Sequence, residues 1–215
     1  GPFAPQTPTG WLIRDTLSAR MSPRRASAAL VAALSAMGVE VVCEAEDAGQ
    51  VLWATGWQGL LALSEALGKP VGAGVKGQSA LLRFDAGDAP QVFAGGLHIV
   101  PHHDGTVAIG STSERDFEDP TSCDDQCEAL VERAVTAMPL LHGAEVVERW
   151  AGVRPRAKSR APMLGGWPGR EGHFIANGGF KIGFGMAPKV AGVMADLMLN
   201  GRDAIPEGFR VEDSL

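Results

Sequence analysis

Two short segments of this chain carry residues whose types and spacing suit the binding of a small anion. The first ends in Arg154, which follows the apolar stretch Trp150–Val153 and precedes Pro155. The proline restricts the backbone of Arg154, and the planar fork of its guanidinium suits the binding of a carboxylate. Arginines also occur at strand ends on ordinary surfaces, and that purely structural role for Arg154 stays open.

The second segment is rich in glycine and reads Gly178-Gly179-Phe180-Lys181-Ile182-Gly183. It lies between a predicted strand over residues 173–176 and a predicted helix that Pro188 begins and Gly201 ends. Glycines allow a ligand to approach the backbone closely, and the start of a helix carries a partial positive charge. The pattern is therefore typical of a site for a flat, electron-rich ligand.

A literal G-x-G-x-x-G motif covers residues 72–77, but its surroundings do not suit a dinucleotide site. Gly68-Lys69-Pro70 precedes it and a strand, rather than a helix, is predicted after it. Dinucleotide-binding glycines instead join a strand to the start of a helix. We therefore expect a glycine-rich linker at residues 72–77.

Histidines and cysteines give no sign of a metal centre. His102 and His103 precede Asp104-Gly105, a hairpin signal, so two solvated side chains are expected there. His98 alternates within a predicted strand and is a candidate for a pocket. Cys123 and Cys127 have no further ligand nearby in the sequence, and we predict no metal site. The motifs of acyl transfer, zinc hydrolysis and nucleotide hydrolysis are also absent from the sequence.

The composition is that of an ordinary globular protein. The chain has 215 residues, a net charge of −6, 45% hydrophobic residues and no tyrosine. This length suits one large domain or two small ones. No apolar run reaches the ~18 residues that suggest a membrane span, and the negative charge argues against nucleic acid as a partner. An odd number of cysteines (three) and no visible signal peptide predict the cytoplasm.

The elements that must position these residues alternate between helices and strands. Ser22 and Pro23 are expected to begin a helix that Gly38 ends. The predicted fold class is mixed, α/β or α+β, with a central antiparallel meander and no internal repeat. Further helices are expected over residues 58–67 and 122–138, and further strands over 39–42, 50–54, 78–84, 96–101, 106–111 and 145–154.

Taken in order, five segments resemble the C-terminal portion of the FAD-dependent D-amino-acid oxidase superfamily, close to its glycine and sarcosine oxidase branch. The resemblance covers nearly the whole chain. The segments are Trp11–Ile13 with the helix at Pro23, Val51–Trp57, Val75–Gln78, the hairpin from Ile99 to Thr112, and Trp150–Pro155 with Gly178–Pro188.

This resemblance implies an enzyme that oxidises the C–N bond of a small amino acid or N-methyl amine to an imine, by hydride transfer to flavin. Arg154 would bind the substrate carboxylate, Lys181 would lie near the flavin ring, and His98 would line the substrate pocket. The residues implied to contact FAD are Thr55, Gly56, Gly178, Gly179, Phe180 and Gly183.

The resemblance also implies two domains that are discontinuous in sequence. Residues 43–70 and 156–215 would belong to a partial, Rossmann-like FAD-binding domain. Residues 71–155 would form an antiparallel-sheet substrate domain, to which residues 1–42 contribute a part and a connecting helix.

The sequence departs from the family in what it lacks. The N-terminal βαβ unit with its dinucleotide motif is not present, and the family's longer excursion is reduced to the residues between Val42 and Gln50. The resemblance thus does not imply FAD binding by this chain alone. Three explanations stay open: a piece of a longer enzyme, a subunit completed by a partner chain or a second copy, and a non-catalytic remnant that does not bind FAD.

Overall fold

The structure is a computed structural model that describes residues 3–215, so Gly1 and Pro2, where the first predicted domain segment begins, lie outside the described residues. Contacts between residues divide the chain into two compact units. Of the described residues, unit 1 contains 3–41 and 76–152, and unit 2 contains 42–75 and 153–215. Strands β2 (Gly72–Arg83) and β6 (Val146–Ala157) contribute residues to both units.

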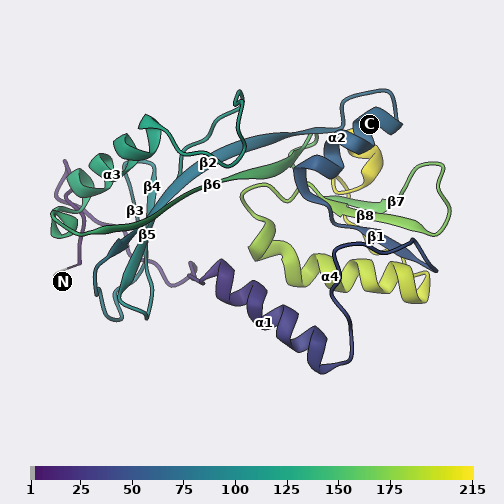
Figure 1. Cartoon of the computed structure of the whole chain (residues 1–215), viewed down its shortest axis with the longest axis horizontal. Coiled ribbons are helices and arrows are strands. Elements are labelled where there is room, and N and C mark those ends of the chain that lie inside the picture. Colours follow the sequence, from purple (N-terminus) through teal and green to yellow (C-terminus); the bar gives the residue numbers. More distant parts are fainter. Residues whose placement is uncertain (1–2) are drawn as a thin grey trace. The chain divides into compact units, whose positions relative to one another are not determined.

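Unit 1 is built on an antiparallel meander. Strands β3 (Val92–Ala94), β4 (Leu97–Pro101) and β5 (Thr106–Gly110) follow one another, and β5 then pairs with β2. The complete order of this five-stranded sheet is β3-β4-β5-β2-β6 (Figure 1). Alternate residues of β4 and β5 are buried, as expected for a sheet with one covered face.

Helix α3 (Asp125–Ala137) supplies the other half of this core. Asp124 caps its start by accepting a hydrogen bond from the backbone N–H of Gln126 at 3.0 Å. Its buried residues pack on the sheet, and a 3₁₀ turn, η1 (Pro139–Leu141), closes the segment. The buried core comprises Ala80, Leu82, Leu97, Ile99, Val107, Ile109, Cys127, Leu130, Ala134, Met138 and Leu141.

Helix α1 (Pro23–Ala36) differs from α3 because it has no buried residue. The Arg24 guanidinium pairs with Glu148 at 2.6 Å and lies 5.1 Å from the centre of the Trp150 ring. Arg25 pairs with Asp104 at 2.9 Å. Polar contacts of its first turn, rather than a buried apolar face, therefore hold α1 on unit 1.

Unit 2 contains a three-stranded mixed sheet. Strand β1 (Val51–Trp53) runs parallel to β8 (His173–Asn177), which pairs antiparallel with β7 (Met163–Gly166). Two helices, α2 (Gly56–Ala66) and α4 (Gly183–Asn200), and a final 3₁₀ turn, η2 (Val211–Ser214), pack on it. Its two hydrophobic core clusters contain the buried residues Leu60, Leu63, Val71, Ala157, Met163, Leu164, Ile175, Val193, Met194, Ile205 and Val211.

The predicted mixed α/β class is confirmed, and most predicted elements are present with shifted ends. The strand predicted over residues 39–42 is wrong: these residues lie outside both sheets and their valines are exposed. Without a neighbouring strand, an apolar run has no partner for its backbone groups. Sequence patterns also missed two short strands: β3, which is followed by Gly95 and Gly96, and β7, which ends in Gly165 and Gly166.

Two further predictions require correction. The final helix begins at Gly183, so Pro188 lies inside it rather than at its start. Residues 72–77 form the first half of β2 rather than a linker, which leaves no strand-to-helix turn at these glycines. Among the helices formed by residues 3–215, none has both the length and the apolar character needed to cross a membrane.

Candidate functional site

In unit 2 the end of β6 is joined to the glycine-rich segment before α4. Arg156 and Gly179 form an isolated antiparallel bridge, and the backbone N–H of Phe180 donates to the carbonyl oxygen of Pro155 at 2.9 Å. These contacts bring together two of the segments that the sequence singled out, residues 154–157 and 178–181.

Gly178 is required at this junction for two reasons. Its φ of +75° lies in the left-handed region, which side chains disfavour. A Cβ atom built on it would lie 2.6 Å from the Cβ of Ala157, far below a normal contact distance. The close approach of the two segments therefore depends on a residue without a side chain.

Cationic side chains converge on the Phe180 ring. The guanidinium carbon of Arg156 lies 5.8 Å from the ring centre, and the Lys181 ammonium lies 5.5 Å from it. Arg154 is half-buried, and it precedes Arg156 by two residues on β6, so both side chains emerge on the same face of that strand. Arg156 escaped the sequence analysis, although its alternation with Arg154 was the signal that marks a second cation on that face.

The start of α4 offers unoccupied backbone donors and space beside them. Its N-cap residue, Ile182, makes no side-chain cap, and its first turn holds no acidic residue. A Cβ atom built on Gly183 or on Gly185 would meet no atom within 4 Å. The first N–H groups of a helix lack intrahelical partners, so this end fits the edge of a flat ligand that carries negative charge.

Asn177 connects the two predicted cofactor-binding segments. Its side-chain NH₂ donates to the carbonyl oxygen of Gly56 at 2.8 Å, and its side-chain oxygen accepts the N–H of Gly178 at 2.7 Å. The turn at Thr55 and Gly56, which begins α2, is thus held beside the end of β8. Sequence reasoning missed Asn177, and its position directly before two glycines at a strand end was the available signal.

His98 belongs to unit 1. It lies on β4 with an exposed side chain, opposite Gly110 of β5, and its ring centre is 4.7 Å from that of Phe93. The other eight predicted site residues, Arg154, Lys181, Thr55, Gly56, Gly178, Gly179, Phe180 and Gly183, all lie in unit 2.

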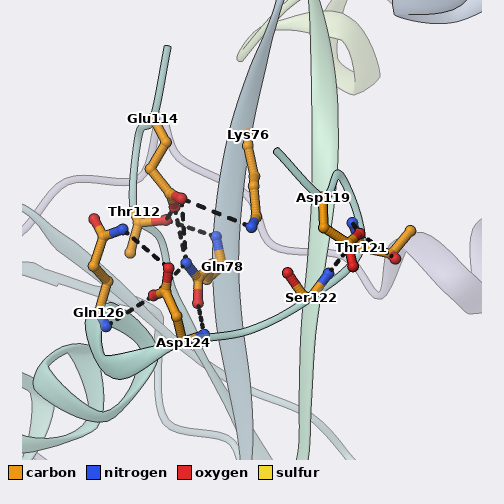
Figure 2. A network of polar contacts seen from close by, with 9 residues as sticks. All are labelled: Lys76, Gln78, Thr112, Glu114, Asp119, Thr121, Ser122, Asp124 and Gln126. Carbon is orange, nitrogen blue, oxygen red and sulfur yellow. Dashed lines mark hydrogen bonds and ion pairs between the residues drawn. The ribbon is translucent and has the colours of Figure 1, made fainter. Parts of the chain in front are cut away.

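A buried polar network lies just beyond the end of β5. Figure 2 shows Lys76 and Gln78 on β2, with Thr112 and Glu114 beside them. Lys76 is only 3% exposed, and its ammonium lies 3.9 Å from a carboxylate oxygen of Glu114. The Gln78 side-chain NH₂ donates to the same carboxylate at 3.2 Å, and the Thr112 hydroxyl also donates to Glu114. The positive charge of Lys76 is therefore paired with Glu114 inside unit 1.

The same network reaches the start of α3. The Gln78 side chain donates to the Asp124 carboxylate at 2.8 Å and accepts the Asp124 backbone N–H at 2.9 Å. The hydrogen bond from the Gln78 side chain, followed by that from the Gln126 backbone, lowers the pKa of Asp124 below its ordinary value. A single buried glutamine thereby fixes β2, the segment after β5 and the helix cap relative to one another.

The cysteines and acidic residues show no metal-binding arrangement. Within residues 3–215, no group of three or more His, Cys, Asp and Glu is placed to hold a metal ion. Burial raises the pKa of the Cys127 thiol to about 11, so this thiol stays protonated at neutral pH.

Comparison with known proteins gives consistent matches. The sequence pattern of the DAO family, described as FAD dependent oxidoreductase, matches residues 2–197. Glycine oxidase of Pseudomonas putida is 36% identical over 165 residues, which are 74% of this chain and 45% of that protein. Glycine oxidase of Pseudomonas aeruginosa is 37% identical over 158 residues, 73% of this chain and 43% of that protein. This chain therefore spans less than half the length of these two relatives.

Solved structures show the same architecture. Glycine oxidase from Geobacillus kaustophilus matches with a TM-score of 0.65 and 29% identity, over 75% of this chain and 45% of that one. L-proline dehydrogenase from P. horikoshii matches with a TM-score of 0.71 and 18% identity, over 88% of this chain and 57% of that one, and this likeness concerns the fold alone. The family pattern covers far more than half of the chain, and the resemblance seen in the sequence is confirmed: the chain belongs to the DAO family of FAD-dependent oxidoreductases.

Proposed function

We propose that this chain takes part in the FAD-dependent oxidation of a small amine that carries a carboxylate, such as a small amino acid or an N-methyl amino acid. In this proposal unit 2 is part of the FAD-binding domain and unit 1 is part of the substrate domain. The family match and the two glycine oxidases at 36% and 37% identity support the reaction class.

One observation carries the proposal: the bridge between Arg156 and Gly179, which joins the strand end of Arg154 to the glycine-rich start of α4. An arginine is thereby held close to the backbone that suits a flat cofactor. The Arg154 guanidinium would bind the substrate carboxylate through two parallel hydrogen bonds. Arg156 and Lys181, both close to the Phe180 ring, would raise the local positive potential and favour an anionic substrate.

The residues present fit the flavin end of FAD. The open space beside Gly183 and the uncapped N–H groups at the start of α4 suit its electron-rich edge. Gly178, Gly179 and Phe180 would line the same side, and the turn at Thr55 and Gly56 would lie beside the cofactor. Bound FAD would supply the acceptor for the hydride that leaves the substrate, whereas the protein would bind and orient the amine. That His98 lines the substrate pocket stays a prediction.

The proposal is tested by adding FAD to the purified chain and recording its visible spectrum, followed by assays of glycine and N-methylglycine oxidation. Arg154→Leu should raise KM at least ~30-fold, because a lost charge-assisted pair costs about 2–5 kcal/mol. Arg154→Lys should recover part of this loss, since it keeps the charge. Arg202→Leu is the matched control, because Arg202 pairs with Asp196 on the surface of the same unit. An unchanged KM for Arg154→Leu would contradict the role of this residue.

A second function, a non-catalytic or incomplete subunit of the same fold, has support of its own. Helix α1 has no buried residue, and large apolar side chains such as Leu30 and Leu34 are exposed on it. A surface of this kind suits cover by a further segment, a partner chain or a second copy. A colourless chain that fails to bind added FAD would favour this second function.

The three unpaired cysteines suit a reducing compartment, and we keep the cytoplasm as the proposed location.

A further inference from the structure

A surface pocket of about 390 Å³ lies in unit 1, where the start of α1 faces the turn between β4 and β5. Arg20 and Arg25 line it from the α1 side, and His102 and His103 line it from the turn. None of these residues belongs to the candidate site in unit 2. The pocket thus brings two guanidinium groups and two imidazoles around one small volume.

Both guanidinium groups keep donors for a ligand. One nitrogen of Arg20 donates to the carbonyl oxygen of Pro101 at 2.5 Å, which fixes the side chain against the wall of the pocket. One nitrogen of Arg25 donates to the Asp104 carboxylate at 2.9 Å. Each guanidinium has five N–H donors, and these two contacts use one nitrogen of each. The Arg25–Asp104 pair is exposed and therefore weak, so an anion in the pocket can replace Asp104 as the partner of Arg25.

The backbone adds to this positive character. Ser22, the N-cap of α1, makes no side-chain cap, and the first turn of the helix carries no acidic residue. Its partial positive charge therefore remains uncompensated by the helix itself. The lining combines this charge with two arginines, whereas the neighbouring carboxylates of Asp104 and Asp88 are not among its lining residues.

We propose that this pocket binds an oxyanion, the phosphate or carboxylate group of a small molecule, with Arg20 and Arg25 as its principal ligands and His102 and His103 as further donors. Guanidinium groups match the planar and tetrahedral oxygens of both anions. The inference goes beyond the proposed oxidation and does not depend on FAD.

His102 gives the pocket a predictable pH dependence. Burial lowers the pKa of His102, and Arg20, Arg25 and His103 act in the same direction, whereas Asp104 opposes them. His103 lies 3.8 Å from Asp88, a second exposed carboxylate. At neutral pH His102 is therefore uncharged, and its protonation on acidification adds a cation to the lining. Anion binding should tighten as the pH falls below ~6.5, the usual histidine pKa.

The experiment uses the full chain and follows the imidazole C–H resonances of His102 and His103 by NMR during titration with inorganic phosphate. Parallel titrations use sulfate and acetate at constant ionic strength. We expect chemical-shift changes that saturate with phosphate concentration and do so at lower concentrations as the pH falls. Saturation by phosphate and sulfate alone identifies a tetrahedral anion, and saturation by acetate as well identifies a site that also takes carboxylates. A linear response to all three anions would overturn the proposal.

Two variants of adjacent residues separate a site from general surface charge. Arg25→Gln should weaken phosphate binding about tenfold, the loss expected for one charge-assisted contact. Arg24→Gln is the matched control, because Arg24 lies on the same turn and is equally exposed but pairs with Glu148 outside the pocket. Thermal unfolding of both variants shows whether α1 is intact. Equal weakening by the two substitutions would contradict a site at Arg25.

Discussion

Two glycine-rich segments of this chain each contain a lysine, and the two lysines have opposite surroundings. Lys76 lies within residues 72–77 on β2, where it is 3% exposed and faces Glu114. Lys181 lies within residues 178–183, where it is exposed beside the Phe180 ring at the entrance to α4. Only the second segment leads from a strand into a helix.

The difference shows that glycine spacing alone does not make a ligand site. In strand β2, the charge of Lys76 is paired with Glu114, and the backbone of the strand pairs with neighbouring segments. At the start of the helix, the lysine side chain is exposed and the first N–H groups lack intrahelical partners. The first lysine should therefore contribute to stability and the second to binding, and four predictions test this contrast.

The largest effect is expected from Lys76→Met. Removing one partner of a buried ion pair leaves Glu114 without its counter-charge, which costs about 3–5 kcal/mol. Urea unfolding followed by circular dichroism should show a much lower midpoint. The double variant Lys76→Met/Glu114→Gln should recover part of the loss because no unpaired charge remains. A single variant as stable as the wild type would remove the basis of the comparison.

Gly178→Val should come next. It forces a β-branched side chain into a left-handed conformation and against Ala157, at a cost of about 2–3 kcal/mol. For a chain of this size the melting temperature should fall by roughly 4–12 °C. Gly185→Ala provides the control, since a Cβ there meets nothing within 4 Å and the residue is helical. Equal melting temperatures for the two variants would show that the junction tolerates a side chain.

Lys181→Met should leave stability nearly unchanged. The side chain is exposed, and loss of its contact with the Phe180 ring costs about 0.5–1 kcal/mol at most. The same urea titration used for Lys76→Met measures this directly. Under the proposed function, the variant should instead raise KM for a carboxylate-bearing substrate. A large loss of stability without a change in KM would reverse the contrast between the two lysines.

The smallest effect concerns acid unfolding at the Lys76 network. The folded pKa of Asp124 is lowered, so its carboxylate contributes stability above the unfolded pKa of ~3.9, and this contribution disappears as the pH falls through the folded value. Asp124→Asn should therefore show a shallower decline of stability below about pH 4. Asp125→Asn, one residue further along, is the control in the same acid titration. Identical acid profiles for wild type and Asp124→Asn would contradict the shift.

Local signals in the sequence were sufficient for most elements, because period, caps and turn residues are properties of adjacent positions. They failed where contacts with segments far away in the sequence determine the structure or the role of a residue. Val39–Val42 has the composition of a strand but no neighbour to pair with. Gly183 begins α4 although Pro188 has the stronger helix-start pattern. Arg156 and Asn177 each carry a local signal, but their contacts form only when β6, α2 and the segment after β8 come together.

Asn177 has a consequence for how this region can evolve. The side-chain amide of Asn177 makes hydrogen bonds to two loops. It donates to Gly56, which is 121 residues away in the sequence, and accepts from Gly178, which is the next residue. Aspartate would keep the acceptor and lose the donor, and leucine would lose both. Substitutions in the two loops therefore both act on Asn177, and their effects on stability should combine non-additively. A change tolerated in one sequence background is then harmful in another, so these loops are expected to diverge together.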